Sequence, residues 1–174
     1  MKLILLIGPA SVGKTTIGNL LAQKLGYTFI DVDSEFCTQI ENIGTYIDTK
    51  GYDKYCEKNS ELTKLLSETI SEPAVLATSS GFLVHTHLPE VIKQNEEILA
   101  TGYSILFLPS PNPEQDVEMI AERQLKRWNG LDKKREKKKF LERFEQYKKY
   151  GNITIHTNKP SDDVVAEIIE KLPN

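Results

Sequence analysis

The sequence predicts an α/β fold in which a five-stranded parallel sheet carries helices on both faces. Short apolar and β-branched runs alternate along the chain with longer helical segments, and strands that are apolar throughout are typical of parallel sheets buried on both sides. The expected strands are 3–7, 28–31, 74–78, 103–108 and 152–156. The expected helices include 14–25, 52–70, 114–128, 133–150 and 162–172.

Length and composition fit a single domain, 1–174, with one core. The 174 residues are 39% hydrophobic and 27% charged, and the formal net charge is -3. That charge provides no basic field for a nucleic acid, and no apolar run approaches a membrane span of about 20 residues. Cys37 and Cys56 lack the spacing of a metal or redox pair, which favours the reducing cytoplasm. No obligate protein partner is evident.

A phosphate-binding loop follows the first expected strand and leads into the first expected helix. It reads G-x-x-x-x-G-K-T. Its backbone N–H groups and the helix N-terminus attract phosphates, Lys14 adds a positive charge, and the Thr15 hydroxyl is suited to Mg²⁺. The sequence therefore predicts binding of ATP and Mg²⁺. The residues expected to bind the nucleotide here are Gly8, Ala10, Ser11, Val12, Gly13, Lys14, Thr15 and Thr16.

Two carboxylates end the second expected strand. Asp31 and Asp33 are two residues apart, and side chains two apart on a strand share one face, so both can point into one cleft. A phosphotransferase needs one group to hold Mg²⁺ and another to accept or orient a hydroxyl proton. Either acid could instead cap a helix that starts near Ser34. Downstream of a phosphate loop, we favour the catalytic role for Asp33.

The third expected strand opens into a turn of small residues, Ser79-Ser80-Gly81, at the edge of the sheet where ligands bind in such folds. Small side chains allow the chain to pass close to a bound molecule. A turn after a strand needs small residues in any case, so this motif is weak evidence alone. His85 and His87 are interpreted as part of a surface turn and not as metal ligands.

Several of these stretches, taken in order, resemble the shikimate kinase family over nearly the whole chain. They are the phosphate loop, D-V-D at 31–33, A-V-L-A-T-S-S-G at 74–81, Arg143 followed by Tyr147, I-H-T at 155–157 and the tail S-D-D-V-V-A-E-I at 161–168. The resemblance implies a P-loop kinase fold with a mobile lid, here at about 111–135. It also implies transfer of the γ-phosphoryl group of ATP to a hydroxyl of a small, carboxylated substrate.

The resemblance also implies roles for individual residues. Asp31 would help to hold Mg²⁺, Asp33 would contact the substrate hydroxyl as a base, and Arg143 would grip a substrate carboxylate. A lid arginine would face the transferring phosphate. The candidates for that arginine are Arg123 and Arg127, the expected adenine-contacting loop includes Asn158 and Pro160, and the other expected substrate-contacting positions are Ser80, Gly81 and Cys56.

Two departures from the family pattern concern the acceptor. The family has three glycines after A-T, whereas this chain keeps only Gly81. The family has G-E-x-x-F-R where this chain reads G-Y-D-K-Y-C, so Cys56 stands at the position of a second arginine that binds the substrate carboxylate. Loss of a charged hydrogen-bond partner costs about 1.5 to 3 kcal/mol. Shikimate remains the expected acceptor. The alternative is a P-loop kinase of another hydroxylated acceptor, such as a nucleoside monophosphate or a sugar acid.

Three further alternatives remain. A GTP-dependent switch is suggested by D-T-K-G at 48–51 and by N-K-P-S-D at 158–162, although the second misses the guanine-reading motif by one residue. A catalytically silent binder of the same fold is the second. Finally, Arg143 and the lysine run at 133–139 could simply be solvated faces of a charged helix. Trp128 could cover the nucleotide or pack under the lid.

Overall fold

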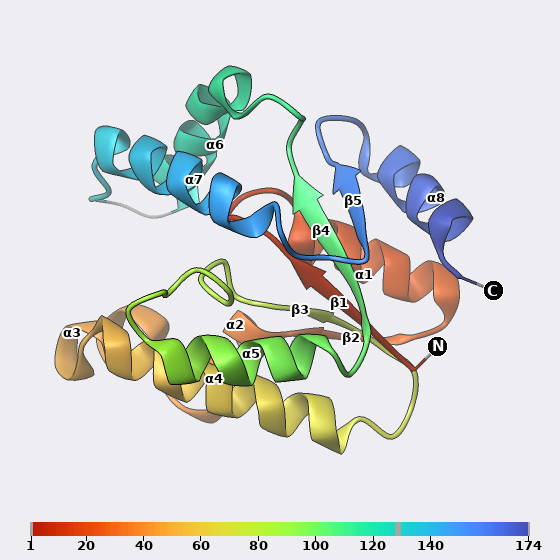
Figure 1. Cartoon of the computed structure of the whole chain (residues 1–174), viewed down its shortest axis with the longest axis horizontal. Helices are drawn as coiled ribbons and strands as arrows, with labels where there is room; N and C mark the ends of the chain where they lie inside the picture. Colours follow the sequence, from red (N-terminus) through yellow and green to blue (C-terminus); the bar gives the residue numbers. More distant parts are fainter. Residues whose placement is uncertain (1, 128–129, 174) are drawn as a thin grey trace.

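A computed structural model describes residues 2–127 and 130–173, and Trp128 lies outside that range. Figure 1 shows how the elements are arranged. In chain order they are β1 (Leu3–Ile7), α1 (Lys14–Leu25), β2 (Thr28–Asp31), α2 (Val32–Gln39), α3 (Ile43–Lys50), α4 (Tyr52–Thr69), β3 (Ala74–Ala77), α5 (Pro89–Leu99), β4 (Tyr103–Leu108), α6 (Pro113–Arg127), α7 (Lys133–Tyr147), β5 (Ile153–His156) and α8 (Ser161–Lys171).

The five strands form one parallel sheet in the order β2-β3-β1-β4-β5. β1 lies at the centre because its five residues are all apolar and all buried. It pairs with β3 on one side, in the register Leu5 opposite Leu76, and with β4 on the other, in the register Leu6 opposite Ile105. The predicted parallel sheet is confirmed, and its carboxyl edge collects the loops that follow β1, β2 and β3.

Helices cover both faces, as predicted. α1 and α8 lie together on one side of the sheet, whereas α4 and α5 lie on the other (Figure 1). The hairpin of α6 and α7 rises beyond the carboxyl ends of the strands, and α7 anchors it by burying Phe140, Phe144 and Tyr147 in the main core. A smaller apolar cluster joins α2, α3 and α4. Its buried members are Phe36, Tyr55, Cys56 and Leu62.

The structure contains three helices besides those expected, namely α2, α3 and α5, of which α2 is the helix near Ser34 that the sequence left as an alternative. α2 begins at Val32, so Asp33 lies in this helix and not at the end of the second strand. The strand stops at Asp31, whose side chain accepts a hydrogen bond from the Ser34 backbone N–H (3.0 Å) and so caps the helix. The premise that Asp31 and Asp33 share the face of a strand is therefore wrong, and the capping residue is Asp31, not Asp33.

Candidate active site

The phosphate loop joins β1 to α1 through backbone conformations that require glycine. Gly8 has a φ of 138°, and a Cβ there would lie 2.3 Å from the Phe107 carbonyl oxygen. Gly13, with φ 95°, is the N-cap of α1. The chain can therefore wrap tightly before the helix starts, and the first N–H groups of α1, which have no acceptor within the helix, are left for a ligand.

Lys14 lies across this loop. Its Nζ donates to the carbonyl oxygens of Gly8 (2.7 Å) and Pro9 (2.8 Å). Burial lowers the pKa of Lys14 to about 8, Asp33 acts in the opposite direction, and Arg143 lowers the pKa further. A polyphosphate beside Lys14 would favour its charged form, so the ammonium is suited to an anionic ligand.

Ser11 holds the turn of the loop in a strained conformation. Its φ is 60°, and its hydroxyl is buried without a hydrogen-bond partner among residues 2–127 and 130–173. The Ser11 carbonyl oxygen accepts from Nη1 of Arg123 (3.3 Å). An uncompensated hydroxyl in a phosphate loop is a donor available to a ligand.

The side chain of Thr15, in the first turn of α1, lies next to that of Asp31, at the end of β2. The Thr15 hydroxyl donates to Asp31 Oδ2 (2.7 Å), while Oδ1 of the same carboxylate caps α2. Hydroxyl and carboxylate oxygens fit Mg²⁺, which binds through one or two side chains together with substrate phosphates. Among residues 2–127 and 130–173, no group of three or more His, Cys, Asp or Glu side chains is placed to hold a metal ion.

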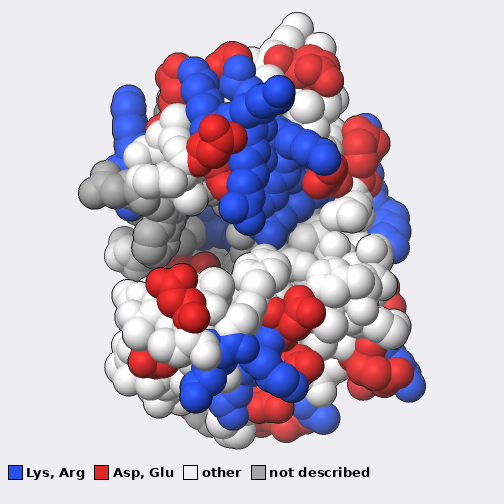
Figure 2. All heavy atoms as spheres, turned by 90° about the vertical axis from the view of Figure 1, so that its left-hand side faces the viewer, with Lys and Arg blue, Asp and Glu red and all other residues white. Residues whose placement is uncertain are grey.

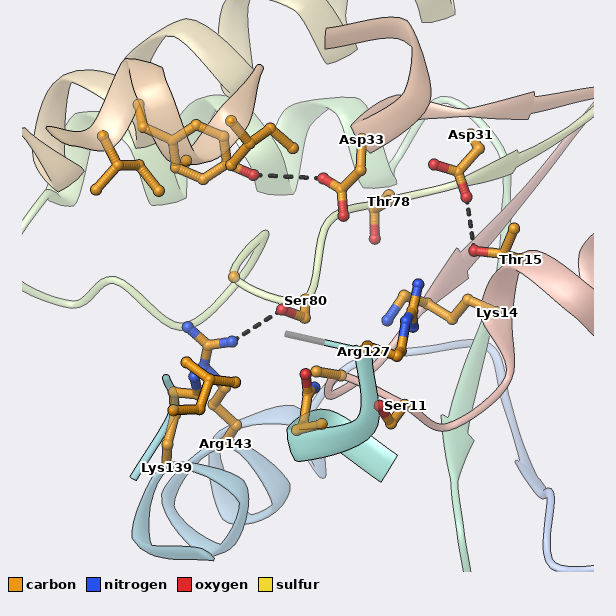
Figure 3. Close-up of a pocket in the computed structure, with 18 of the residues that line it drawn as sticks. Ser11, Lys14, Thr15, Asp31, Asp33, Thr78, Ser80, Arg127, Lys139 and Arg143 are labelled. Atoms are coloured by element: carbon orange, nitrogen blue, oxygen red, sulfur yellow. Dashed lines mark hydrogen bonds between the residues drawn. The ribbon is translucent and has the colours of Figure 1, made fainter. Parts of the chain in front are cut away.

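Asp33 lies in the first turn of α2 and faces the same cavity as Asp31 (Figure 3). The hydroxyl of Tyr55 donates to Asp33 Oδ1 (3.3 Å). Burial raises the pKa of Asp33, and the neighbouring Asp31 carboxylate raises it further, whereas Lys14 and the bond from Tyr55 favour the ionised form. A carboxylate with a raised pKa has a stronger affinity for a proton, as a general base requires.

A cavity of about 600 Å³ connects the phosphate loop to a second wall built by α3, α4, α7 and the turn after β3 (Figure 3). The predicted residues that line it are brought together from five separate stretches of sequence. They are Ala10, Ser11, Gly13, Lys14, Thr15, Thr16, Asp31, Asp33, Ser80, Gly81, Arg127 and Arg143.

Arg143 is held at this second wall by two hydroxyl groups. Its Nη1 donates to Ser80 Oγ (2.9 Å) and its Nη2 donates to the Tyr52 hydroxyl (3.0 Å). One turn later, buried Tyr147 donates from its hydroxyl to the Ser80 carbonyl oxygen (3.3 Å). Arg143 is therefore a fixed cation in the cavity and not a solvated residue on a charged helix.

The two arginines that were candidates for the lid role take different positions. Arg127, in the last turn of α6, lines the cavity and points to the region around Lys14 (Figure 3). Arg123 does not line the cavity and instead contacts the outside of the loop at Ser11. Ion pairs from Glu118 to Lys133 and Lys137 join α6 to α7.

Besides Arg123, five predicted positions lie outside the cavity lining. Val12 is buried in the main core, and Gly8 is covered by the β4 backbone. Asn158 and Pro160 are exposed in the loop between β5 and α8, where the Asn158 N–H donates to the Pro109 carbonyl oxygen (3.0 Å). Cys56 is buried against the apolar cluster of α2, α3 and α4, where burial raises the pKa of its thiol to about 12.

The structure adds residues that sequence reasoning missed. Tyr52 and Tyr55 line the cavity from the first turn of α4, and Lys139 lines it one turn before Arg143. The spacings of three and four residues, which place such pairs on one helix face, were the available signal. The interpretation of His85 as a surface residue is wrong. His85 is 7% exposed and lies behind Tyr52, whereas His87 is exposed beside Asp53.

Lysine and arginine side chains gather over α6 and α7 on the face shown in Figure 2. Most belong to the run at 133–139, which is largely exposed. Several of these lysines pair with glutamates, as in the bond from Lys139 to buried Glu136 (2.6 Å). The run is thus mainly a solvated helix face, as the sequence favoured, except where Lys139 turns into the cavity. None of the described helices is both long and apolar enough to cross a membrane.

Comparisons with known proteins agree with this geometry. A family model described as shikimate kinase matches residues 10–173. A shikimate kinase from Enterococcus faecalis is 32% identical over 99% of both chains. The solved shikimate kinase from Aquifex aeolicus is 26% identical, covers 97% of this chain and 94% of its own, and superposes with a TM-score of 0.72. That from Acinetobacter baumannii, solved in complex with shikimate, has a TM-score of 0.78 at 24% identity, with 99% and 96% covered.

The switch-protein and silent-binder alternatives are not favoured by any of these matches. The kinase fold, the phosphate loop and the relatives that match from end to end all indicate the same family. The chain therefore belongs to the shikimate kinase family of ATP- and Mg²⁺-dependent phosphotransferases that act on a hydroxyl group.

Proposed function

We propose that this chain transfers the γ-phosphoryl group of ATP to a hydroxyl of shikimate. The observation that carries the proposal is the shared cavity, in which the phosphate loop and Asp33 lie with the guanidinium of Arg143. A hydroxylated carboxylate that places its carboxylate at Arg143 can present a hydroxyl toward Asp33. The bound shikimate of the Acinetobacter baumannii relative supports this choice of acceptor.

The reaction joins the acceptor oxygen to the γ-phosphorus and breaks the bond to the β-phosphate oxygen, which leaves with ADP. Asp33 accepts the proton of the acceptor hydroxyl. Lys14 and Arg127 stabilise the charge on the transferring group, because both point to the same part of the cavity. Mg²⁺, when bound, neutralises phosphate charge, and Thr15 and Asp31 are the residues that would hold it.

The experiment is ADP release from Mg-ATP in the presence of shikimate, nucleoside monophosphates, sugar acids or no acceptor. We expect shikimate to accelerate ADP release well above the rate without acceptor at micromolar to low-millimolar concentrations. Acceleration by another compound and silence with shikimate would contradict the proposed acceptor. Preference for GTP over ATP would contradict the proposed donor.

Three predicted site residues that do not line the cavity need proposals of their own. Asn158 and Pro160 lie in the exposed loop after β5, next to the carboxyl edge of the sheet, and this position supports contact with the adenine of ATP. Arg123 would act on the phosphates only if α6 moved, since it now contacts the outer side of the loop. We propose Arg127 as the lid arginine and, of the segment 111–135, the described parts 111–127 and 130–135 as the mobile lid.

A further inference from the structure

The second wall of the cavity carries an unusual arrangement of donors around Arg143. Both terminal nitrogens of the guanidinium donate to side-chain hydroxyls, one to Ser80 and the other to Tyr52. An oxygen that accepts from Arg143 keeps its own proton available. The wall therefore offers the remaining N–H groups of Arg143 together with two O–H donors.

The Tyr52 hydroxyl has two polar neighbours besides Arg143. These are His85 Nε2, at 3.5 Å, a distance at the limit of a hydrogen bond, and the buried thiol of Cys56. The Tyr52 side chain lines the cavity and is 39% exposed. Burial raises the pKa of Tyr52, so the phenol keeps its proton at neutral pH. An anion at Arg143 would attract that proton more strongly than the imidazole does.

The charges of the groups near this wall are compatible with a bound anion. Cys56 is buried against the apolar cluster, and its thiol stays neutral at physiological pH because its pKa is about 12. Lys139 also lines the cavity, but its ammonium is paired with Glu136 (2.6 Å). Arg143 is thus the cation of this wall that is held by neutral oxygens instead of by a carboxylate.

We propose that Tyr52 and Ser80 donate hydroxyl hydrogen bonds directly to the acceptor carboxylate that Arg143 binds. The proposal rests on the proposed function, since it assumes a carboxylated acceptor. It makes Tyr52 a determinant of acceptor affinity, with one guanidinium and two hydroxyls forming the carboxylate site. Hydrogen bonds of this kind add affinity because charged acceptors bind hydroxyl donors more strongly than neutral ones do.

The test compares Tyr52→Phe and Ser80→Ala with the wild type, using shikimate and its uncharged methyl ester as acceptors. We expect each variant to lose roughly tenfold in kcat/KM for shikimate and less than about threefold for the ester, because bonds to a charged group are the stronger ones. KM for ATP should not change. Tyr46→Phe is the matched control, because Tyr46 packs on Phe36 in the neighbouring apolar cluster and does not line the cavity.

A second comparison separates direct donation from mere support of Arg143. If Tyr52 acts only by holding the guanidinium, Tyr52→Phe has no further effect in an Arg143→Ala background. Direct donation predicts a further loss of at least about threefold in kcat/KM for shikimate. Equal losses with shikimate and its ester, or no loss in the Arg143→Ala background, would overturn the proposal.

Failure of the proposed function gives a different result. If the wild type ignores shikimate but phosphorylates another hydroxy acid, the acceptor assignment is wrong, and the same variants with that acid and its ester test the carboxylate site. If the wild type accepts only uncharged compounds, or none, both proposals are overturned. Thermal unfolding of each variant, expected within about 2 °C of the wild type, checks that the fold is intact.

Discussion

The two ends of the cavity are built on different principles. The phosphate end is made within residues 8–15 from backbone N–H groups, two glycines and one lysine, and its shape is fixed by local conformation. The acceptor end is made from side chains of α4, α7 and the turn after β3, which come together only when the sheet has formed. Binding of phosphate is thus a property of one loop, whereas choice of acceptor depends on the packing of distant elements.

Asp33 lies between the two ends, and its removal should have the largest effect. We expect Asp33→Asn to lower kcat by about a thousandfold, within the range typical of general-base catalysis, while nucleotide affinity is kept. Steady-state turnover and titration with an ATP analogue measure the two effects. Asp48→Asn, on an exposed position of α3, is the matched control. Normal turnover of the Asp33→Asn enzyme would remove this residue from the mechanism.

At the phosphate end, the two candidate arginines should behave differently. Arg127→Ala is expected to lower kcat by about a hundredfold or more, because Arg127 lines the cavity beside Lys14. Arg123→Ala loses one exposed bond to a backbone carbonyl, and we expect kcat to change less than about threefold. Rapid-quench measurement of the transfer step compares them. The reverse order of effects would assign the lid role to Arg123.

At the acceptor end, Tyr55 should orient Asp33 through its hydroxyl. We expect Tyr55→Phe to lower kcat by roughly tenfold with little change in KM for ATP, because one hydrogen bond to a carboxylate is lost and the ring remains packed on Phe36. Tyr46→Phe, on the other edge of the same ring, is the control. If Tyr55→Phe and Tyr46→Phe are equally stable but only Tyr55→Phe has a lower kcat, the result supports a positioning role for Tyr55. An unchanged kcat of Tyr55→Phe would exclude that role.

Stability, and not turnover, should respond to His85, which packs behind the acceptor wall near Tyr52, Arg143, His87 and Asp53. Burial lowers its pKa from 6.5 to about 4, and Arg143 and His87 act in the same direction. The unfolded chain therefore binds more protons between these values, so the contribution of His85 to stability is complete above pH 6.5 and is lost toward pH 4.

This loss should amount to about 1 to 3 kcal/mol, reduced by solvent screening. Denaturant unfolding of wild type and His85→Gln from pH 7 to pH 4.5 measures it. The variant should show a flatter dependence on pH, and His87→Gln is the control for an exposed histidine. If the free energies of unfolding of the wild type and of His85→Gln depend on pH in the same way, protonation of His85 does not affect the stability of the acceptor wall.

The contrast between the local phosphate loop and the acceptor end, which is built from distant elements, explains which features could be predicted from the sequence. The phosphate loop, the five strands and the placing of Arg143 could be predicted because each depends on a short pattern or on the family pattern. The roles of Tyr52 and Tyr55 could not, since each depends on a partner far away in the chain. Asp31 and Asp33 were placed correctly in the cavity but for the wrong reason, because Asp33 lies in the helix that Asp31 caps and not on the strand.

The missed helices have a physical explanation. α2 and α3 have eight residues each, and α3 buries none of its side chains completely, so neither gives a long apolar stripe. Cys56 was expected in the cavity because of its position in the motif. Yet the neighbouring Tyr52 and Tyr55 face the cavity, and Cys56 packs into the apolar cluster beside them.

The contrasting burial of the two cysteines has a practical use. Cys37 is exposed on α2, one turn beyond Asp33, whereas Cys56 is enclosed and stays protonated. Thiol-directed reagents react with thiolates, so a maleimide dye should attach selectively at Cys37. The native chain thereby offers a single labelling point next to its reaction centre, from which fluorescence can follow ligand binding without any engineered cysteine.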